Sequence, residues 1–135
     1  MVSGLTKSYG KARGIDGLTL RVGEGEFFGF IGPNGAGKST TIRTLIGLIK
    51  ADAGKAEIFG KDIQKENRKI LEETGYLPSE AIFYPGMKVG EVIELSAKLR
   101  GRDCKEEAEE LCSRLELDRG KKVRELSFGN RKKLG

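Results

Sequence analysis

The stretch "GFIGPNGAGKST", residues 29–40, places four glycines, a proline and a lysine between an apolar run and an amphipathic run. Glycine reaches backbone dihedrals that other residues avoid, and it lets a ligand approach the main chain closely. A cluster this dense predicts either a tight turn or a cradle for a ligand. The residues on either side decide between the two.

The sequence before the loop, "LTLRVGEGEFFGFIG", predicts strands over 18–22 and 26–31 joined by a turn at 23–25. The second strand is almost entirely apolar, which is typical of a strand buried on both faces of a sheet. After the loop, "KSTTIRTLIGLIK" predicts a helix. Its apolar residues at helical spacing are Ile42, Leu45, Ile46 and Ile49.

The loop matches the pattern G-x-x-x-x-G-K-[ST] at Gly32, Gly37, Lys38 and Ser39. Successive backbone N–H groups in such a loop, together with the positive end of the following helix, attract a polyphosphate. The Lys38 ammonium would reach the β and γ phosphates, and the Ser39 hydroxyl would bind Mg²⁺. A purely structural turn would not explain why Lys38 and two hydroxyl residues, Ser39 and Thr40, lie at the start of the helix.

The rest of the chain divides into two regions that differ in their predicted secondary structure. Up to residue 86, short strands are predicted in "GKAEIFG" and in "TGYLP", which Pro78 ends, with a polar helix in "QKENRKILEE" between them. We therefore predict an α/β nucleotide-binding core over 1–86, followed by a helical subdomain over 87–135.

Two amphipathic helices are predicted in that subdomain, the first ended by Gly101 and the second opened by a capping box of Asp103 and Glu106. The first carries the apolar stripe Val89, Val92, Ile93, Ser96 and Leu99. The second carries Cys104, Ala108, Leu111, Cys112 and Leu115.

Composition excludes several classes of protein. Two cysteines and no histidine provide neither a disulfide framework nor a structural zinc site. A net charge of +5 fits an anionic ligand. The basic stretch "DRGKKVRELSFGNRKK" lacks interleaved aromatic residues, so no nucleic-acid partner is expected. The sequence shows neither a signal peptide nor an apolar run of membrane-spanning length, which predicts a cytoplasmic protein.

Taken in order, "LTKSYGK", the glycine loop, "GYLPSE" and "LSFGNRKKLG" resemble an ATP-binding cassette (ABC) transporter ATPase subunit over about residues 5–135. The resemblance implies a phosphate-loop ABC ATPase fold that binds ATP and Mg²⁺. Tyr9, which lies at the end of a plausible first strand, would stack on adenine; packing at an edge is its plainer role. The implied ATP-binding residues are Tyr9, Gly32, Pro33, Asn34, Gly35, Ala36, Gly37, Lys38, Ser39 and Thr40.

The same resemblance implies partners. A second ATPase subunit would bind head to tail, so that Ser127 and Gly129 of "LSFGN" contact the ATP held by the partner. A transmembrane permease would hold the subunit on the inner face of the cell membrane. Ser79 stands where the family has a Mg²⁺-binding Gln, and Phe128 and Asn130 replace residues of the LSGGQ signature.

The family continues beyond the signature to a catalytic Asp, Glu and His, whereas this chain ends and holds no His. The resemblance therefore predicts a truncated N-terminal portion with no catalytic residue of its own, in which Lys38 only assists charge stabilisation. The strand at 26–31 would have open edges, because its neighbours belong to the absent half.

The sequence leaves three functions open. The complete subunit would couple ATP hydrolysis to transport, and "GYLPSEAIFYPGMKV" is similar to exporter-type subunits. The alternatives are a nucleotide-binding fragment without turnover, and another phosphate-loop NTPase or kinase. No N-K-x-D guanine motif begins at Asn34, Asn67 or Asn130, which disfavours a GTPase.

Overall fold

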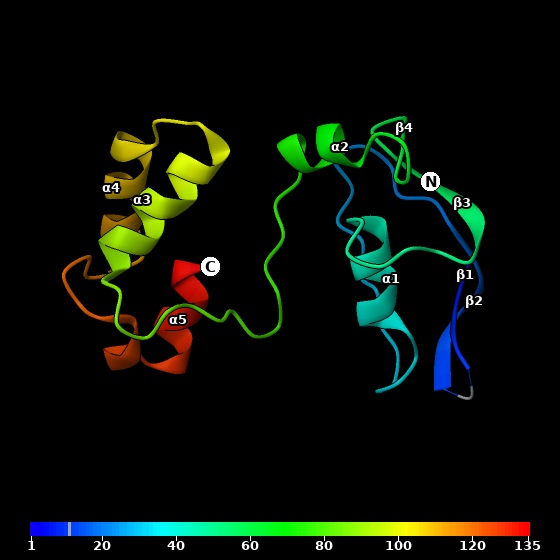
Figure 1. Ribbon diagram of the computed structural model, residues 1–135, viewed down its shortest axis with the longest axis horizontal. Coiled ribbons are helices and arrows are strands. Elements are labelled where there is room, and N and C mark those ends of the chain that lie inside the picture. The colour runs from blue at the N-terminus through cyan, green and yellow to red at the C-terminus, as the bar shows by residue number, and fades with distance from the viewer. Residues whose placement is uncertain (11) are drawn as a thin grey trace. The chain divides into compact units, whose positions relative to one another are not determined.

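The computed structural model describes residues 1–10 and 12–135, which divide by their contacts into two units (Figure 1). Unit 1 is Met1–Gly75 and unit 2 is Tyr76–Gly135. Each unit has a hydrophobic cluster of its own. The two units are therefore described separately.

Unit 1 is built on an antiparallel sheet in the order β2-β1-β3-β4. Its strands are β1 (Val2–Tyr9), β2 (Ala12–Leu20), β3 (Ala53–Ile58) and β4 (Lys61–Asp62). Val2 lies opposite Leu20 of β2 on one side and opposite Ala56 of β3 on the other. The first strand is thus paired along both edges, and its residues Val2 and Leu5 are buried.

Two helices complete unit 1, α1 (Lys38–Leu45) and α2 (Asn67–Glu73). Figure 1 shows α1 beside the strand pair β1–β2, and α1 contacts β2. The predicted helix after the glycine loop is confirmed, but it ends at Leu45, where the chain turns toward Gly47 in the left-handed region (φ 76°). Ile46 is buried as expected, whereas Ile42 is exposed and two threonines of α1, Thr41 and Thr44, are buried instead.

The predicted strand at 26–31 is wrong: these residues form no strand. Phe27 and Ile31 are essentially fully exposed, at 104% and 93% of their reference areas. A strand needs a neighbour to accept and donate its backbone hydrogen bonds, and no described strand lies alongside this segment. The strand predicted in "TGYLP" is wrong for the same reason, and Leu77 is half exposed.

Unit 2 is helical, as predicted, with α3 (Val89–Arg100), α4 (Lys105–Arg114), the short 3₁₀ turn η1 (Val123–Glu125) and α5 (Phe128–Leu134). Its buried cluster joins residues of three helical elements and their connections: Val89, Cys112, Leu117 and Leu126, with Ile93 and Leu134 against them. Gly101 ends α3 in the left-handed region (φ 63°), which confirms its predicted role.

Two details of unit 2 differ from the prediction. The residue preceding α4 is Cys104, and the Asp103 carboxylate accepts a hydrogen bond from the Lys105 N–H (3.2 Å), so Asp103 and Glu106 form no capping box. Leu99 is 80% exposed, because the buried stripe of α3 is confined to its first turns. Among the described residues, no helix has the length and apolar content needed to cross a membrane.

Candidate nucleotide-binding site

The glycine loop is a tight turn that leads directly into α1. The Ala36 N–H donates to the Pro33 carbonyl (3.2 Å), and Gly35 and Gly37 both lie in the left-handed region at φ 80° and 84°. Glycine adopts this region without steric cost, which explains why both positions are glycine. The second of these glycines, Gly37, is the residue immediately before the first turn of the helix.

The start of α1 leaves backbone donors unused by the helix. Its first helical hydrogen bond runs from the Thr41 N–H to the Gly37 carbonyl (2.8 Å), and the Thr41 hydroxyl donates to the same oxygen (2.9 Å). The N–H groups of Lys38, Ser39 and Thr40 precede that bond and have no acceptor within the helix. These amides and the helix dipole together favour an anion at this end.

The Lys38 side chain folds back over the loop. Its ammonium donates to the carbonyl oxygens of Gly32 (2.5 Å) and Pro33 (2.8 Å). The single positive charge is therefore held at the mouth of the loop, where it adds to the field of the helix end. Carbonyl oxygens carry only partial charge, so a phosphate oxygen would be the stronger acceptor for this ammonium.

Close backbone packing fixes the loop against the sheet. A Cβ on Gly37 would collide with the Gly14 carbonyl oxygen of β2, and a Cβ on Gly14 would collide with the Lys7 carbonyl oxygen of β1. The start of α1, β2 and β1 therefore approach one another more closely than side chains allow. This stack sets the position of the loop relative to the end of β1.

A cleft of about 630 Å³ lies between the loop and the sheet in unit 1. Strand β1, strand β2 and the loop with α1 all contribute to its walls. The lining residues are Thr6, Lys7, Ser8, Gly14, Ile15, Asp16, Leu18, Phe30, Gly35, Ala36 and Thr41. The cleft is of the size that holds small ligands and cofactors.

Tyr9 ends β1 with its ring 47% exposed. The Lys7 ammonium lies 5.7 Å from the centre of that ring and 2.7 Å from the Asp52 Oδ1 atom. The hydrogen bond from Lys7 is the main cause that holds the pKa of the Asp52 carboxyl below its ordinary value, followed by the one from the Ser8 N–H. An exposed ring at a strand end, beside this cleft-lining lysine, has the form of a stacking platform.

The remaining predicted residues lie in unit 2. Ser127 precedes α5 and its hydroxyl accepts a hydrogen bond from the Asn130 N–H (3.2 Å), so it caps that helix. Ser79 lies on an exposed bend. The Lys132 ammonium donates to the Pro78 carbonyl (3.0 Å), which brings the Ser79 bend and α5 together within the unit.

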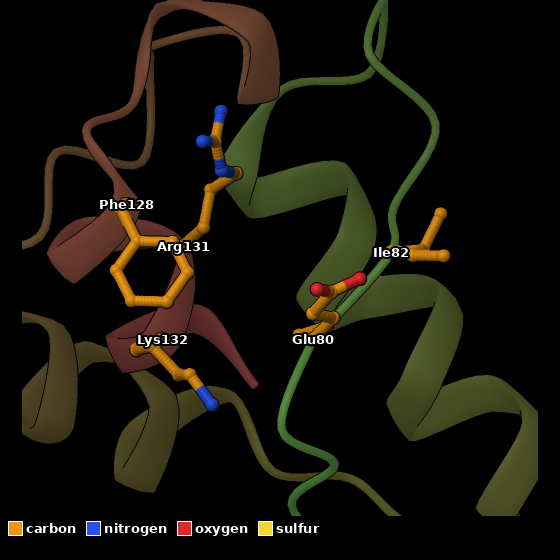
Figure 2. A pocket seen from close by; sticks show the side chains of 6 residues that line it. Glu80, Ile82, Phe128, Arg131 and Lys132 are labelled. Atoms are coloured by element: carbon orange, nitrogen blue, oxygen red, sulfur yellow. The ribbon is translucent and has the colours of Figure 1, made fainter.

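A pocket of about 300 Å³ opens where these two segments meet. Figure 2 shows Phe128, Arg131 and Lys132 of α5 on one side and Glu80 on the other. The Phe128 ring is 63% exposed, with the Lys132 ammonium 5.9 Å from its centre. Among the described residues, no group of three His, Cys, Asp or Glu side chains is placed to bind a metal ion.

A family model described as "ABC transporter" matches residues 15–135. The chain belongs to this family. This ABC chain is similar to the bacitracin transport ATP-binding protein BcrA of Bacillus licheniformis, at 38% identity over 97% of the chain and 44% of that protein. It is equally similar, at 38% identity, to the daunorubicin resistance ATP-binding protein DrrA3 of Streptomyces coeruleorubidus, with 98% of the chain and 44% of that protein covered.

Solved structures agree with the sequence comparisons. The ATP-binding subunit of an ABC transporter superposes with a TM-score of 0.82 at 29% identity, over 98% of this chain and 57% of the other. A putative ABC transporter ATP-binding protein from Pyrococcus furiosus gives a TM-score of 0.81 at 27% identity, over 98% and 65%. The ABC ATPase fold is therefore confirmed, and the chain spans less than half the length of the curated relatives described above.

Sequence reasoning missed three residues that the structure places beside the loop or at the end of β1: Lys7, Gly14 and Asp52. Gly14 is a lone glycine in the sequence. It is explained by its close contact with the backbones of β1 and of the start of α1, which depends on the tertiary structure. Asp52 lies 45 residues from Lys7 along the chain. No local pattern links a lysine on one strand to a carboxylate that precedes another, so the sequence alone offered no signal for this pair.

Proposed function

We propose that this ABC chain binds Mg-ATP at the loop 32–40. The observation that carries the proposal is the start of α1: two left-handed glycines precede a helix whose first N–H groups have no acceptor within the helix, and the Lys38 ammonium donates to two carbonyl oxygens of the loop. On ATP binding, we expect Lys38 to exchange its carbonyl acceptors for phosphate oxygens. The loop residues Gly32 to Thr40 named above make up the proposed phosphate site.

The residues present fit a magnesium ion that enters with the nucleotide. The Ser39 hydroxyl is exposed in the first turn of α1, and hydroxyl and phosphate oxygens are the hard ligands that Mg²⁺ prefers. When bound, Mg²⁺ would neutralise phosphate charge. Ser79 is a second proposed ligand, acting through a water molecule, since its short side chain lies on an exposed bend.

For the base, we propose stacking on Tyr9. Its ring is about half exposed at the end of β1, where it can cover an adenine without being withdrawn from a core. The base site and the phosphate site then both belong to the part of the chain before residue 86, and the segment 87–135 serves contacts with other subunits.

We further propose that the signature residues Ser127 and Gly129 serve a second ATPase subunit bound head to tail. A Cβ on Gly129 would meet nothing closer than the Ser127 hydroxyl at 4.0 Å, so unit 2 itself provides no steric reason for glycine in this helix. Glycine inside a helix costs about 0.5–1 kcal/mol relative to alanine. Close approach by a ligand from outside the unit would explain it.

In its transporter, we propose, the protein acts with a transmembrane permease on the inner face of the membrane and couples ATP hydrolysis to export. The names of relatives mention bacitracin transport, daunorubicin resistance and linearmycin resistance, which supports a substrate of the antibiotic class. Hydrolysis needs a positioned water and several charges besides the phosphate cradle. We therefore expect this chain alone to bind ATP without turnover.

The test is calorimetric titration of the chain with Mg-ATP, accompanied by a phosphate-release assay. Lys38→Ala should weaken binding about ten- to hundredfold, because a charge-assisted hydrogen bond is lost. Lys50→Ala, at an exposed position of the same unit, is the control and should bind as the wild type does. Equal affinity of the Lys38→Ala chain and the wild type would overturn the phosphate site, and steady phosphate release would overturn the absence of turnover.

A further inference from the structure

A carboxylate outside the glycine loop anchors the end of β1. Asp52, in the connection before β3, accepts a hydrogen bond from the Lys7 ammonium through Oδ1 (2.7 Å) and one from the Ser8 N–H through Oδ2 (2.8 Å). The Asp52 N–H in turn donates to the Thr6 carbonyl (2.9 Å). One residue thus holds three consecutive positions of β1, and Tyr9 is the next residue along the strand.

The Lys7 side chain carries this constraint to the ring. Lys7 and Tyr9 are two apart on one strand, so their side chains lie on the same face. The ammonium lies 5.7 Å from the ring centre, within the range of a cation–π contact. The Lys7 side chain is 18% exposed, and its partner carboxylate keeps the ammonium from pointing freely into solvent.

Unit 1 contains a second cluster of the same kind away from the glycine loop. The Lys61 ammonium lies 2.6 Å from the Glu73 Oε1 atom and 5.9 Å from the centre of the Phe59 ring. Here too a lysine lies between a carboxylate and an exposed aromatic ring. This cluster has the chemistry of the first without its place beside the cleft, which makes it a matched control.

We propose that Asp52 is a positioning residue for the nucleobase: by fixing Lys7 and the end of β1, it orients the Tyr9 ring for stacking on adenine. The inference rests on the proposed function, in which Tyr9 is the base-stacking residue. It goes beyond that function in one respect. Asp52 would contact neither the adenine nor the phosphates, yet it would contribute to the preference of the chain for a nucleotide over a polyphosphate without a base.

The experiment compares the affinities of the chain for Mg-ATP and for Mg-tripolyphosphate by calorimetry. Both probes carry a triphosphate, so a change in the general electrostatic field acts on both in the same direction, and Glu73→Gln, which removes the same charge from unit 1, measures what remains of that change in the ratio of affinities. In Asp52→Asn, we expect the ratio favouring ATP to fall about two- to fivefold, the equivalent of an exposed cation–π contact. Glu73→Gln should leave the ratio unchanged.

A double variant tests whether Asp52 acts through the ring. Tyr9→Ala should lower the ratio at least as far as Asp52→Asn, and adding Asp52→Asn to Tyr9→Ala should lower it no further, because two residues in one chain of contacts are not additive. An unchanged ratio in Asp52→Asn, or full additivity in the double variant, would overturn the inference.

A measurement without nucleotide separates this inference from the proposed function. The Lys7 side-chain methylene protons near the Tyr9 ring should show ring-current shifts by NMR, and Asp52→Asn should move them toward values typical of a free lysine. The same shifts in wild type and Asp52→Asn would overturn the inference. A wild type with this NMR signature that binds neither probe would instead remove the proposed function.

Discussion

The segment 26–31 is more apolar than any strand of the sheet β2-β1-β3-β4, yet only the sheet is folded into a core. Leu5 of β1 is completely buried, whereas Ile31 is 93% exposed. The difference lies in the backbone. The strand β1 is hydrogen-bonded on both sides, to β2 and to β3, while none of the described strands pairs with 26–31.

The comparison shows that an apolar sequence alone does not bury a segment, because the backbone groups of the segment also need hydrogen-bond partners. A strand satisfies its backbone groups only with a neighbouring strand, and leaving them unpaired in an apolar core costs more than leaving the side chains in water. The segment 26–31 therefore stays in solvent despite its composition. In agreement with this, a Cβ on Gly29 would meet only the Ile31 side chain, whereas a Cβ on Gly14 would meet the backbone of β1.

The largest expected effect comes from truncating a buried residue of the sheet. Leu5→Ala should lower the free energy of unfolding of unit 1 by about 2–5 kcal/mol, because it removes a fully buried side chain. Ile31→Ala, in the exposed segment, should change it by less than about 0.5 kcal/mol. Urea unfolding followed by circular dichroism measures both. A comparable loss in the two variants would mean that 26–31 is packed in solution.

A glycine pair sharpens the same contrast. Gly14→Ala places a methyl group against the Lys7 carbonyl and should destabilise unit 1 by about 1–3 kcal/mol, since the neighbouring backbone must move. In Gly29→Ala the new Cβ meets only the Ile31 side chain at 3.9 Å, and we expect little change or a small gain. Thermal unfolding of the two variants would show it, and equal melting temperatures would refute the close packing at Gly14.

Much of the candidate site was predictable because its signals are local. The glycine spacing, the lysine and the helix after the loop all lie within residues 32–45, and the structure places α1 and its two left-handed glycines there. The sequence could not show that residues 26–31 form no strand, because strand formation depends on a partner elsewhere in the chain. Asp52 escaped for a similar reason: its role is set by Lys7, which is distant in the sequence.

The third effect is a loss of stability at low pH. It should arise in the sheet of unit 1 and its connections, and not in the segment 26–31. Hydrogen bonds lower the pKa values of Asp52 (mainly from Lys7), Asp62 (from the Gln64 N–H) and Glu66 (from Lys69). A carboxyl whose folded pKa is lowered stabilises the fold above its ordinary pKa of about 4, and this contribution is lost as pH falls through the folded value.

The stability of unit 1 should therefore be constant with respect to these groups from pH 7 to 5 and decline below about pH 4, as the carboxyls are protonated. Urea midpoints measured at each pH would reveal the decline. Replacing all three carboxylates by their amides should flatten it. A decline of the same size in that triple variant would assign the acid sensitivity to other groups.

The smallest effect on stability is expected in the segment 26–31. Substitutions there should instead reduce the exposed apolar surface of the chain. Phe27→Ser combined with Ile31→Ser removes two side chains that contribute almost nothing to the core, so the free energy of unfolding should shift by no more than about 0.5 kcal/mol. Binding of the apolar dye ANS should fall, because the two side chains form part of an exposed apolar stretch. Leu48→Ser, at an isolated exposed position, should reduce dye binding less. If the double variant instead lost stability while its dye binding stayed the same, residues 26–31 would belong to a core, and the distinction between apolar composition and strand pairing would not hold for this chain.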